Sequence, residues 1–160
     1  MPDPTPLPRE NVQSYPRPPL IEPVPHPIRI TLGGALVAET TRGFRVCETH
    51  HAPTYYLPPE DFSARLTPCP GASFCEWKGQ ARYFDITAGG TTARRAAWAY
   101  DSPTPHFAAL AGYLAVYPGA MEHCSVAGME VTPQPGDFYG GWVTANLDGI
   151  VKGGPGTLGW

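Results

Sequence analysis

The sequence predicts a mainly β domain, built as a small barrel or tent-like sheet with one short helix. Two Gly-Gly pairs, Gly33-Gly34 and Gly89-Gly90, each stand between segments of strand-like residues, as in β-hairpins. Prolines and glycines, 21 and 18 of the 160 residues, divide the rest of the chain into short segments. Only the segment near Thr104 begins like a helix. Short strands, many turns and little helix favour a single β domain.

The first predicted hairpin spans residues 28–40. Apolar residues alternate along its first strand, and the Gly33-Gly34 pair supplies the positive φ that a two-residue turn requires. Alternation continues in residues 43–49, which predicts a further strand. Residues 60–66 follow two prolines and are predicted to form at most one helical turn.

The second predicted hairpin spans residues 81–100 and turns at Gly89-Gly90. A short helix is predicted over Thr104–Ala111, because a proline follows the Thr and a glycine follows the last alanine. Residues 113–117 and 128–133 fit short strands.

The predicted domain organisation is a proline-rich arm (1–27), a β domain (28–132) and a glycine-rich tail (133–160). Ten prolines lie in the arm, which therefore cannot form a helix or a central strand. Either the arm is disordered or polyproline-like, or it packs along the domain from Tyr15 onward. The tail holds four large aromatic residues that favour burial against the domain: Phe138, Tyr139, Trp142 and Trp160.

Composition argues against several classes of partner. The net charge is −3, charged residues are 16% of the chain, and Arg94-Arg95 is the only adjacent basic pair, so no nucleic-acid footprint is predicted. No apolar run approaches the roughly 20 residues of a membrane span. The first residues do not fit a signal peptide, which makes a cytoplasmic location the default expectation. The oligomeric state is left open between monomer and homodimer.

Four cysteines occur at irregular spacings: Cys47, Cys69, Cys75 and Cys124. In the cytoplasm they are expected to be reduced, and without a C-x-x-C pair a four-thiolate zinc site is not predicted. The adjacent His50 and His51 face opposite sides of an extended chain, so a shared metal is not predicted either. We therefore expect neither a metal nor another cofactor.

The candidate catalytic residues are Cys75, Lys78 and Glu48. One of only two lysines stands three residues after Cys75, and an ammonium close to a thiol lowers its pKa and supplies a nucleophilic thiolate. This closeness requires a turn, because residues three apart on a strand face opposite sides. Glu48, in a semi-enclosed space, would transfer protons. Alternatively, the cysteine is buried packing, the lysine is a solvated turn residue and the glutamate is exposed.

Aromatic residues near these segments predict a small polar pocket. The candidate ligand-binding residues are Tyr56, Trp77, Tyr83, Trp98 and Tyr100. Their hydroxyl and indole groups need polar partners, which a small polar or aromatic ligand can provide. The alternative is that most of them are ordinary core residues.

Together, several of these segments resemble a family of unknown function, DUF427, over about residues 10–160. The segments that carry the resemblance are "ETHHAPTYYLPPEDF", "FCEWKGQARYF", "AAWAYDSP" and "AGYLAVYPG", with "YPRPPLIEP" and "PGDFYGGW" as flanks typical of its longer form. The resemblance implies a β-rich, Mss4-like (β-tent) fold and no established activity. The family's other label, nucleotidyltransferase-like, has little support here, because the chain lacks a D-x-D pair and a phosphate-binding P-loop.

Three functions are consistent with these residues. The first is an enzyme that acts on a small metabolite with Cys75, Lys78 and Glu48. The second is a binding module that uses the same pocket for a small ligand, with Lys78 pairing an anionic group. The third is a β-sheet adaptor that recognises a peptide or protein through its proline-rich arm.

Overall fold

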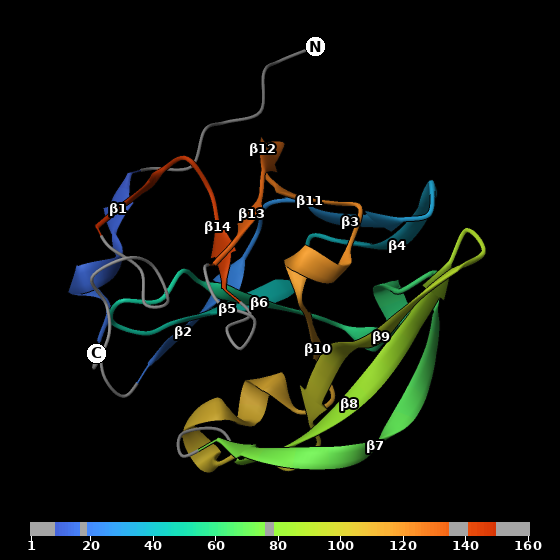
Figure 1. Ribbon diagram of the computed structural model, residues 1–160. Helices are drawn as coiled ribbons and strands as arrows, with labels where there is room; N and C mark the ends of the chain where they lie inside the picture. Colours follow the sequence, from blue (N-terminus) through green and yellow to red (C-terminus); the bar gives the residue numbers. More distant parts are fainter. Residues whose placement is uncertain (1–8, 17–18, 76–78, 135–140, 150–160) are drawn as a thin grey trace.

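The computed structural model describes residues 9–16, 19–75, 79–134 and 141–149, with only the backbone described at 71–75 and 79. Most of the described strand residues lie in two antiparallel sheets (Figure 1). The larger sheet contains, in spatial order, β2 (Leu20–Val24), β5 (Gly43–Cys47), β6 (Thr54–Leu57), β10 (Leu114–Val116), β9 (Thr91–Tyr100), β8 (Gly79–Ala88) and β7 (Arg65–Cys75). The smaller contains β12 (Met129–Glu130), β11 (His123–Val126), β3 (Ile28–Leu32) and β4 (Ala35–Thr40).

Two short strand pairs complete the sheet structure. The parallel pair joins β1 (Glu10–Asn11) to β15 (Leu147–Asp148), and therefore the two ends of the described chain. The antiparallel pair joins β13 (Thr132–Pro133) to β14 (Trp142–Val143). The prediction of a mainly β fold is confirmed. The described strands close no barrel, because β2 and β7 remain the open edges of the seven-stranded sheet.

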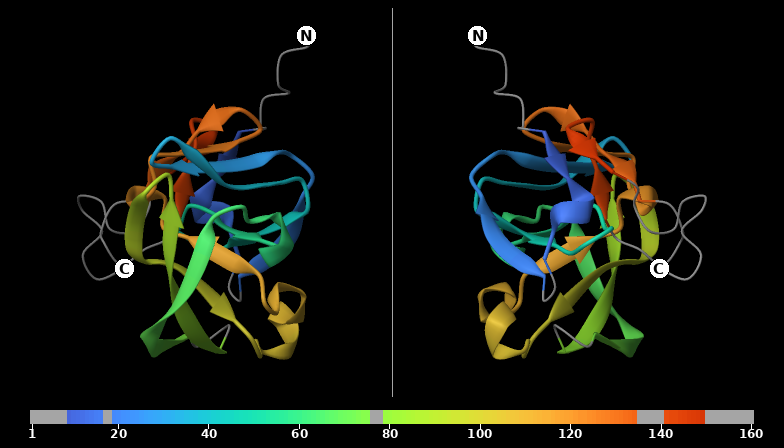
Figure 2. Two further views of the ribbon diagram at one scale, coloured as in Figure 1. Left: turned by 90° about the vertical axis from the view of Figure 1, so that its right-hand side faces the viewer. Right: turned by 90° about the vertical axis from the view of Figure 1, so that its left-hand side faces the viewer.

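The two sheets pack face to face and enclose the main core. In Figure 2 the four-stranded sheet lies above the green to gold strands β7–β10. Alternate residues of both sheets supply the buried side chains, among them Ile28, Ile30, Leu57 and Val116. Trp142 of β14 is fully buried, and its indole Nε1 donates a hydrogen bond to the Val116 carbonyl at 3.0 Å. The predicted burial of this tail residue is confirmed, whereas Trp160 lies outside the described residues.

Both predicted Gly-Gly hairpins are present, and their tips touch each other. Gly33, Gly34, Gly89 and Gly90 have φ values of 61°, 77°, 55° and 77°, as a two-residue turn between antiparallel strands requires. A Cβ atom added to Gly89 would lie 2.1 Å from the Gly33 carbonyl oxygen. One hairpin belongs to each sheet, so this contact joins the sheets at the right-hand end of Figure 1.

Strand β7 was not predicted from the sequence, because Pro68 and Pro70 mark it as irregular. The structure places it at an edge of the seven-stranded sheet. An edge strand tolerates proline, because one of its sides has no neighbouring strand to which an N–H must donate. The register shift in the β7–β8 pair, between Cys69 and Ala72, accommodates Pro70. The opposite edge, β2, contains Pro23 for the same reason.

The helices in the described part of the chain are 3-10 turns. They are η1 (Val12–Ser14), η2 (Pro59–Asp61), η3 (Pro105–Leu110) and η4 (Pro118–Ala120). The helix predicted over Thr104–Ala111 corresponds to η3, which is a kinked 3-10 segment with a non-helical Phe107. No helix among the described residues is long and apolar enough to cross a membrane.

Candidate functional site

A row of aromatic side chains crosses the seven-stranded sheet on its outer face, which is the face turned away from the four-stranded sheet. Phe44, Tyr56, Ala115, Trp98 and Tyr83 are consecutive strand partners from β5 to β8. Strand partners point to the same side of a sheet, so the side chains form one line. We call these five residues the aromatic row. It brings together three of the predicted ligand-binding residues from three different strands.

The centre of the aromatic row is buried. Tyr56, Trp98 and the nearby Tyr100 are 1, 8 and 5% exposed, and η3 covers them with Phe107 and Leu110. The Tyr56 ring meets the Trp98 ring edge-on at a centroid distance of 6.5 Å and the Tyr100 ring at 6.4 Å. These contacts are typical of a packed aromatic core. A ligand-binding role for the three residues stays a prediction.

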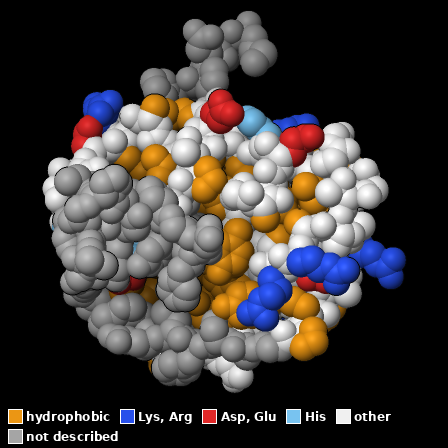
Figure 3. All heavy atoms as spheres, in the orientation of Figure 1, with side chains coloured by type: hydrophobic (Ala, Val, Ile, Leu, Met, Phe, Trp, Pro, Cys, Tyr) orange, Lys and Arg blue, Asp and Glu red, His pale blue; other side chains and the backbone are white. Residues whose placement is uncertain are grey.

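The end of the aromatic row at β8 is more accessible. Tyr83 is half-buried, and the half-buried Tyr117 packs on Trp98 at a centroid distance of 4.5 Å. Burial raises the pKa of Tyr117, and a hydrogen bond with Tyr83 raises it further. The guanidinium carbon of Arg95 lies 4.1 Å from the Tyr83 ring centroid, as in a cation–π contact. We call Tyr83, Arg95, Trp98 and Tyr117 the Arg95 surface. Figure 3 shows hydrophobic side chains next to Lys and Arg side chains on the side of the molecule that carries β8, β9 and β10.

A β-bulge holds Arg95 in this position. The register between β8 and β9 shifts at Asp85, and Arg95 has a positive φ of 47°. Its backbone N–H donates to Asp85 Oδ1 at 2.9 Å, and its Nη1 donates to the Pro70 carbonyl at 3.2 Å. The neighbouring Arg94 is 84% exposed at its side chain and forms a 3.6 Å ion pair with Asp85. Two adjacent arginines therefore have different environments, which the sequence did not indicate.

The candidate catalytic residues are only partly described. Glu48 follows β5, is half-buried, and begins a turn in which its carbonyl accepts a hydrogen bond from His51 N at 3.0 Å. Cys75 is the last residue of β7 and pairs with Gly79 at the start of β8. The Cys75 side chain, Trp77 and Lys78 lie outside the described residues. Their proposed closeness stays a prediction.

The three cysteines with described side chains are weak acids. Burial raises the pKa of Cys47 and of Cys124 to about 12. Desolvation and the neighbouring Asp85 also raise the pKa of the half-buried Cys69. Within the described ranges, no three His, Cys, Asp or Glu side chains gather as metal ligands.

Sequence reasoning missed a second cluster, on the inner face of the same sheet. Glu22, Arg45 and Tyr55 are consecutive strand partners of β2, β5 and β6, and Arg45 is only 18% exposed at its side chain. The Arg45 guanidinium donates to both carboxylate oxygens of Glu10, at 2.6 and 3.0 Å, and also to Glu22 Oε1. Tyr15 donates its hydroxyl to Glu10 at 2.7 Å. The proline-rich arm thus supplies two carboxylates to an arginine of the domain.

A pocket of about 210 Å³ adjoins this cluster. We call it the Arg45 pocket. Its lining residues are Glu10, Glu22, Pro23, Val24, Pro25, His26, Arg45, Tyr55, Val126 and Asn146. Burial would raise the pKa of Glu10, but the hydrogen bonds from Arg45 and Tyr15 outweigh burial and hold that pKa below its ordinary value. Burial raises the pKa of Tyr55 to about 12. The pocket lining therefore includes both charged and polar groups.

Comparison with known protein families identifies the family of this chain. A family model described as a domain of unknown function (DUF427) matches residues 20–127, which span β2 to β11. This match confirms the resemblance seen in the sequence. A search among curated proteins found none that matches. The aromatic row lies within the matched region, whereas Glu10 and Asn146 of the Arg45 pocket lie in the flanks.

Proposed function

This chain belongs to the DUF427 family, a domain of unknown function, and we propose that it is a binding module for a small aromatic anion. The proposed site is the Arg95 surface, at the accessible end of the aromatic row. The observation that carries the proposal is the placement of the Arg95 guanidinium directly against the half-buried Tyr83 ring, on a surface that also carries the half-buried Tyr117. A planar ligand can stack on such rings while its negative group binds the cation.

The hydrogen bonds of Arg95 support an anionic ligand. Among the described residues, its guanidinium has a single hydrogen-bond acceptor, the Pro70 carbonyl. The remaining N–H donors can therefore bind a carboxylate or phosphate, whose geometry matches a guanidinium. The bulge at Asp85 fixes the Arg95 backbone, and the contacts with the Pro70 carbonyl and the Tyr83 ring restrain its guanidinium, so less conformational freedom is lost when a ligand binds.

The second candidate is an enzyme that uses Cys75 as a nucleophile, with Lys78 and Glu48. The pKa values of the other three cysteines, Cys47, Cys69 and Cys124, are raised, so their thiols stay protonated at neutral pH. Cys75 is therefore the thiol to test as a nucleophile.

The adaptor function has less support. Its contact surface was predicted to be the proline-rich arm. The described part of that arm contains the buried Val12, strand β2 paired to β5, and Glu10 bound to Arg45, so these groups are engaged in the fold.

The test is saturation-transfer NMR with 4-hydroxybenzoate and phenyl phosphate as probes, and with 4-hydroxybenzamide as the neutral comparison. We expect the wild-type protein to bind the anions and Arg95→Gln to bind them at least about tenfold more weakly, since a hydrogen bond to a charged group contributes about 1.5–3 kcal/mol. Arg94→Gln is the matched control, with the same change of charge one residue away, and should bind like the wild type. Equal losses in both variants would indicate general charge attraction and reject the site, as would equal binding of the benzamide.

A further inference from the structure

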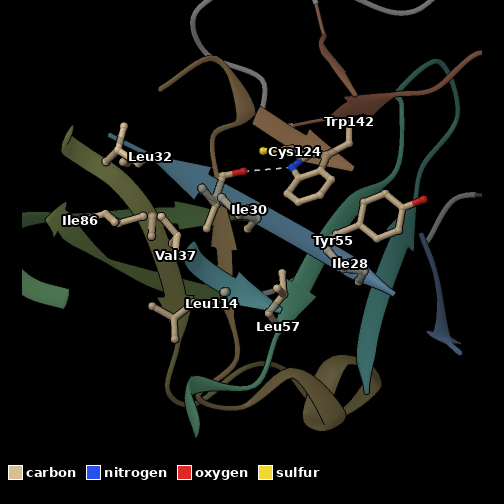
Figure 4. Close-up of a cluster of buried hydrophobic side chains, with 14 of the residues drawn as sticks. Ile28, Ile30, Leu32, Val37, Tyr55, Leu57, Ile86, Leu114, Cys124 and Trp142 are labelled. Atoms are coloured by element: carbon tan, nitrogen blue, oxygen red, sulfur yellow. Dashed lines mark hydrogen bonds between the residues drawn. The ribbon is translucent and has the colours of Figure 1, made fainter. Parts of the chain in front are cut away.

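The Arg45 pocket is separate from the Arg95 surface. Arg45 and Tyr55 point to the inner face of the sheet, whereas their chain neighbours Phe44 and Tyr56 belong to the aromatic row on the outer face. In Figure 4 the Tyr55 ring lies at the edge of the core cluster, and its hydroxyl points away from the other labelled side chains. A ligand in the Arg45 pocket would therefore not touch the Arg95 surface.

The polar wall of the pocket has an excess of negative charge. Glu10 and Glu22 both bind the one guanidinium of Arg45, so one unit of negative charge is left over when His26 is neutral. Both contacts from Arg45 to Glu22 use the same oxygen, Oε1. In the described part of the chain, Glu22 Oε2 has no protein partner, and the Glu22 side chain is 36% exposed. A carboxylate oxygen on the pocket lining is thus open to a donor from outside the protein.

The other lining residues include four apolar ones, and the space is small. Pro23, Val24, Pro25 and Val126 line it with aliphatic carbon. The volume of about 210 Å³ is below the roughly 300–1,000 Å³ of pockets for drug-sized ligands. The space therefore suits one small group that has a charged end and a compact apolar body.

We propose that the Arg45 pocket binds a small organic cation, a primary amine with an aliphatic body. The ammonium group donates to Glu22, next to the Glu10–Arg45 ion pair, and the aliphatic body packs on the prolines and Val126. An isolated anion is disfavoured here, because Arg45 already has a carboxylate on each side. Glu10 and Asn146, from outside the family-matched region, complete the pocket wall.

The experiment is a titration of the full chain with cyclohexylamine at about pH 8, where imidazole is neutral and the amine is charged. Cyclohexanol and cyclohexanecarboxylate are the neutral and anionic comparisons. Binding is followed by amide chemical shifts in two-dimensional NMR. We expect saturable shifts for the amine alone, confined to the amides of lining residues such as Glu22, Val24, Arg45 and Val126. Shifts that do not saturate, that spread over the surface, or that the carboxylate produces instead would overturn the proposal.

Two variants test the role of the carboxylate. Glu22→Gln keeps the size of the side chain and removes its charge, and we expect the affinity for cyclohexylamine to fall at least about tenfold. The variant should fold, because Glu10 still holds Arg45 through two hydrogen bonds. Glu39→Gln is the control, since this carboxylate pairs with Arg29 at an exposed position, and it should bind the amine like the wild type. Unchanged affinity in Glu22→Gln overturns the proposal, and the wild-type shift map still tests it if that variant fails to fold.

Discussion

The contact between the two hairpin tips predicts that alanine at Gly89 destabilises the protein more than alanine at Gly90, the next residue of the same turn. Gly89 and Gly90 both have positive φ, at 55° and 77°, so alanine at either position incurs a backbone cost of about 1–2 kcal/mol. Their surroundings differ. A Cβ at Gly89 would lie 2.1 Å from the Gly33 carbonyl oxygen and 2.7 Å from its carbonyl carbon, whereas a Cβ at Gly90 meets no atom within 4 Å. Because the obstacle at Gly89 is backbone, it cannot rotate away, and the two tips must separate.

We expect Gly89→Ala to cost about 1–3 kcal/mol more than Gly90→Ala, the usual range for overpacking a tightly packed site. For a chain of this length this corresponds to a melting temperature roughly 2–12 °C lower than in Gly90→Ala. Urea unfolding followed by circular dichroism measures both variants. Gly33→Ala and Gly34→Ala repeat the comparison in the other hairpin, where a Cβ at Gly33 would lie 2.7 Å from the Ala88 carbonyl oxygen and one at Gly34 meets nothing within 4 Å. Equal losses within each pair would show that the tips do not touch, and would refute this packing of the two sheets.

Three further outcomes are expected. The pKa of Glu10 is lowered in the folded protein, so the Glu10 carboxylate stabilises the fold at pH values above its ordinary pKa of 4.5. This stabilisation is lost as the pH falls through the lowered pKa. The urea midpoint should therefore fall less steeply with decreasing pH in Glu10→Gln than in the wild type, whereas Glu39→Gln should behave like the wild type. The same pH dependence in Glu10→Gln and the wild type would contradict a stabilising role of the Glu10 carboxylate. Trp142→Phe removes an indole donor and buried volume and should lower the free energy of unfolding by about 1–3 kcal/mol, whereas an unchanged urea midpoint would contradict its burial. Iodoacetamide alkylation of Cys75, followed by peptide mass spectrometry, should have a midpoint below neutral pH, under the ordinary thiol pKa of about 8.5, and this midpoint should rise in Lys78→Met. No reaction in either protein, with normal folding of Lys78→Met, would exclude a catalytic thiol.

Local chemistry explains why the two hairpins and several other strands could be predicted from the sequence. The Gly-Gly turns and the alternating residues beside them determine β3–β4 and β8–β9 without reference to the rest of the chain. Strand β7 could not be predicted in this way, because Pro68 and Pro70 are compatible with a strand only at a sheet edge. Whether a strand lies at an edge depends on the order of all the strands, which a local pattern does not contain.

The candidate sites show the same limit. Tyr56, Tyr83 and Trp98 could be proposed as a group, but no local pattern contains the register that places them in one row whose centre is covered by η3. Arg45 was not singled out at all, because its partner Glu10 stands 35 residues away in a segment whose prolines suggested a separate arm. A polar cluster that joins a terminal segment to a central strand has no local signature.

The Arg45 pocket and the aromatic row are linked through the register of one strand pair. Arg45 faces Tyr55 on the inner side of β5 and β6, and Phe44 faces Tyr56 on the outer side. Because side chains alternate along a strand, a slip of one residue in this pair would move the charged cluster toward the aromatic cluster and the aromatic row toward the pocket. The Glu10–Arg45–Glu22 ion pairs oppose such a slip, since a guanidinium moved to the outer face would lose both carboxylates and be buried among aromatic rings. The charged cluster therefore helps to fix the aromatic row at Phe44 and Tyr56 as well as the geometry of its own pocket.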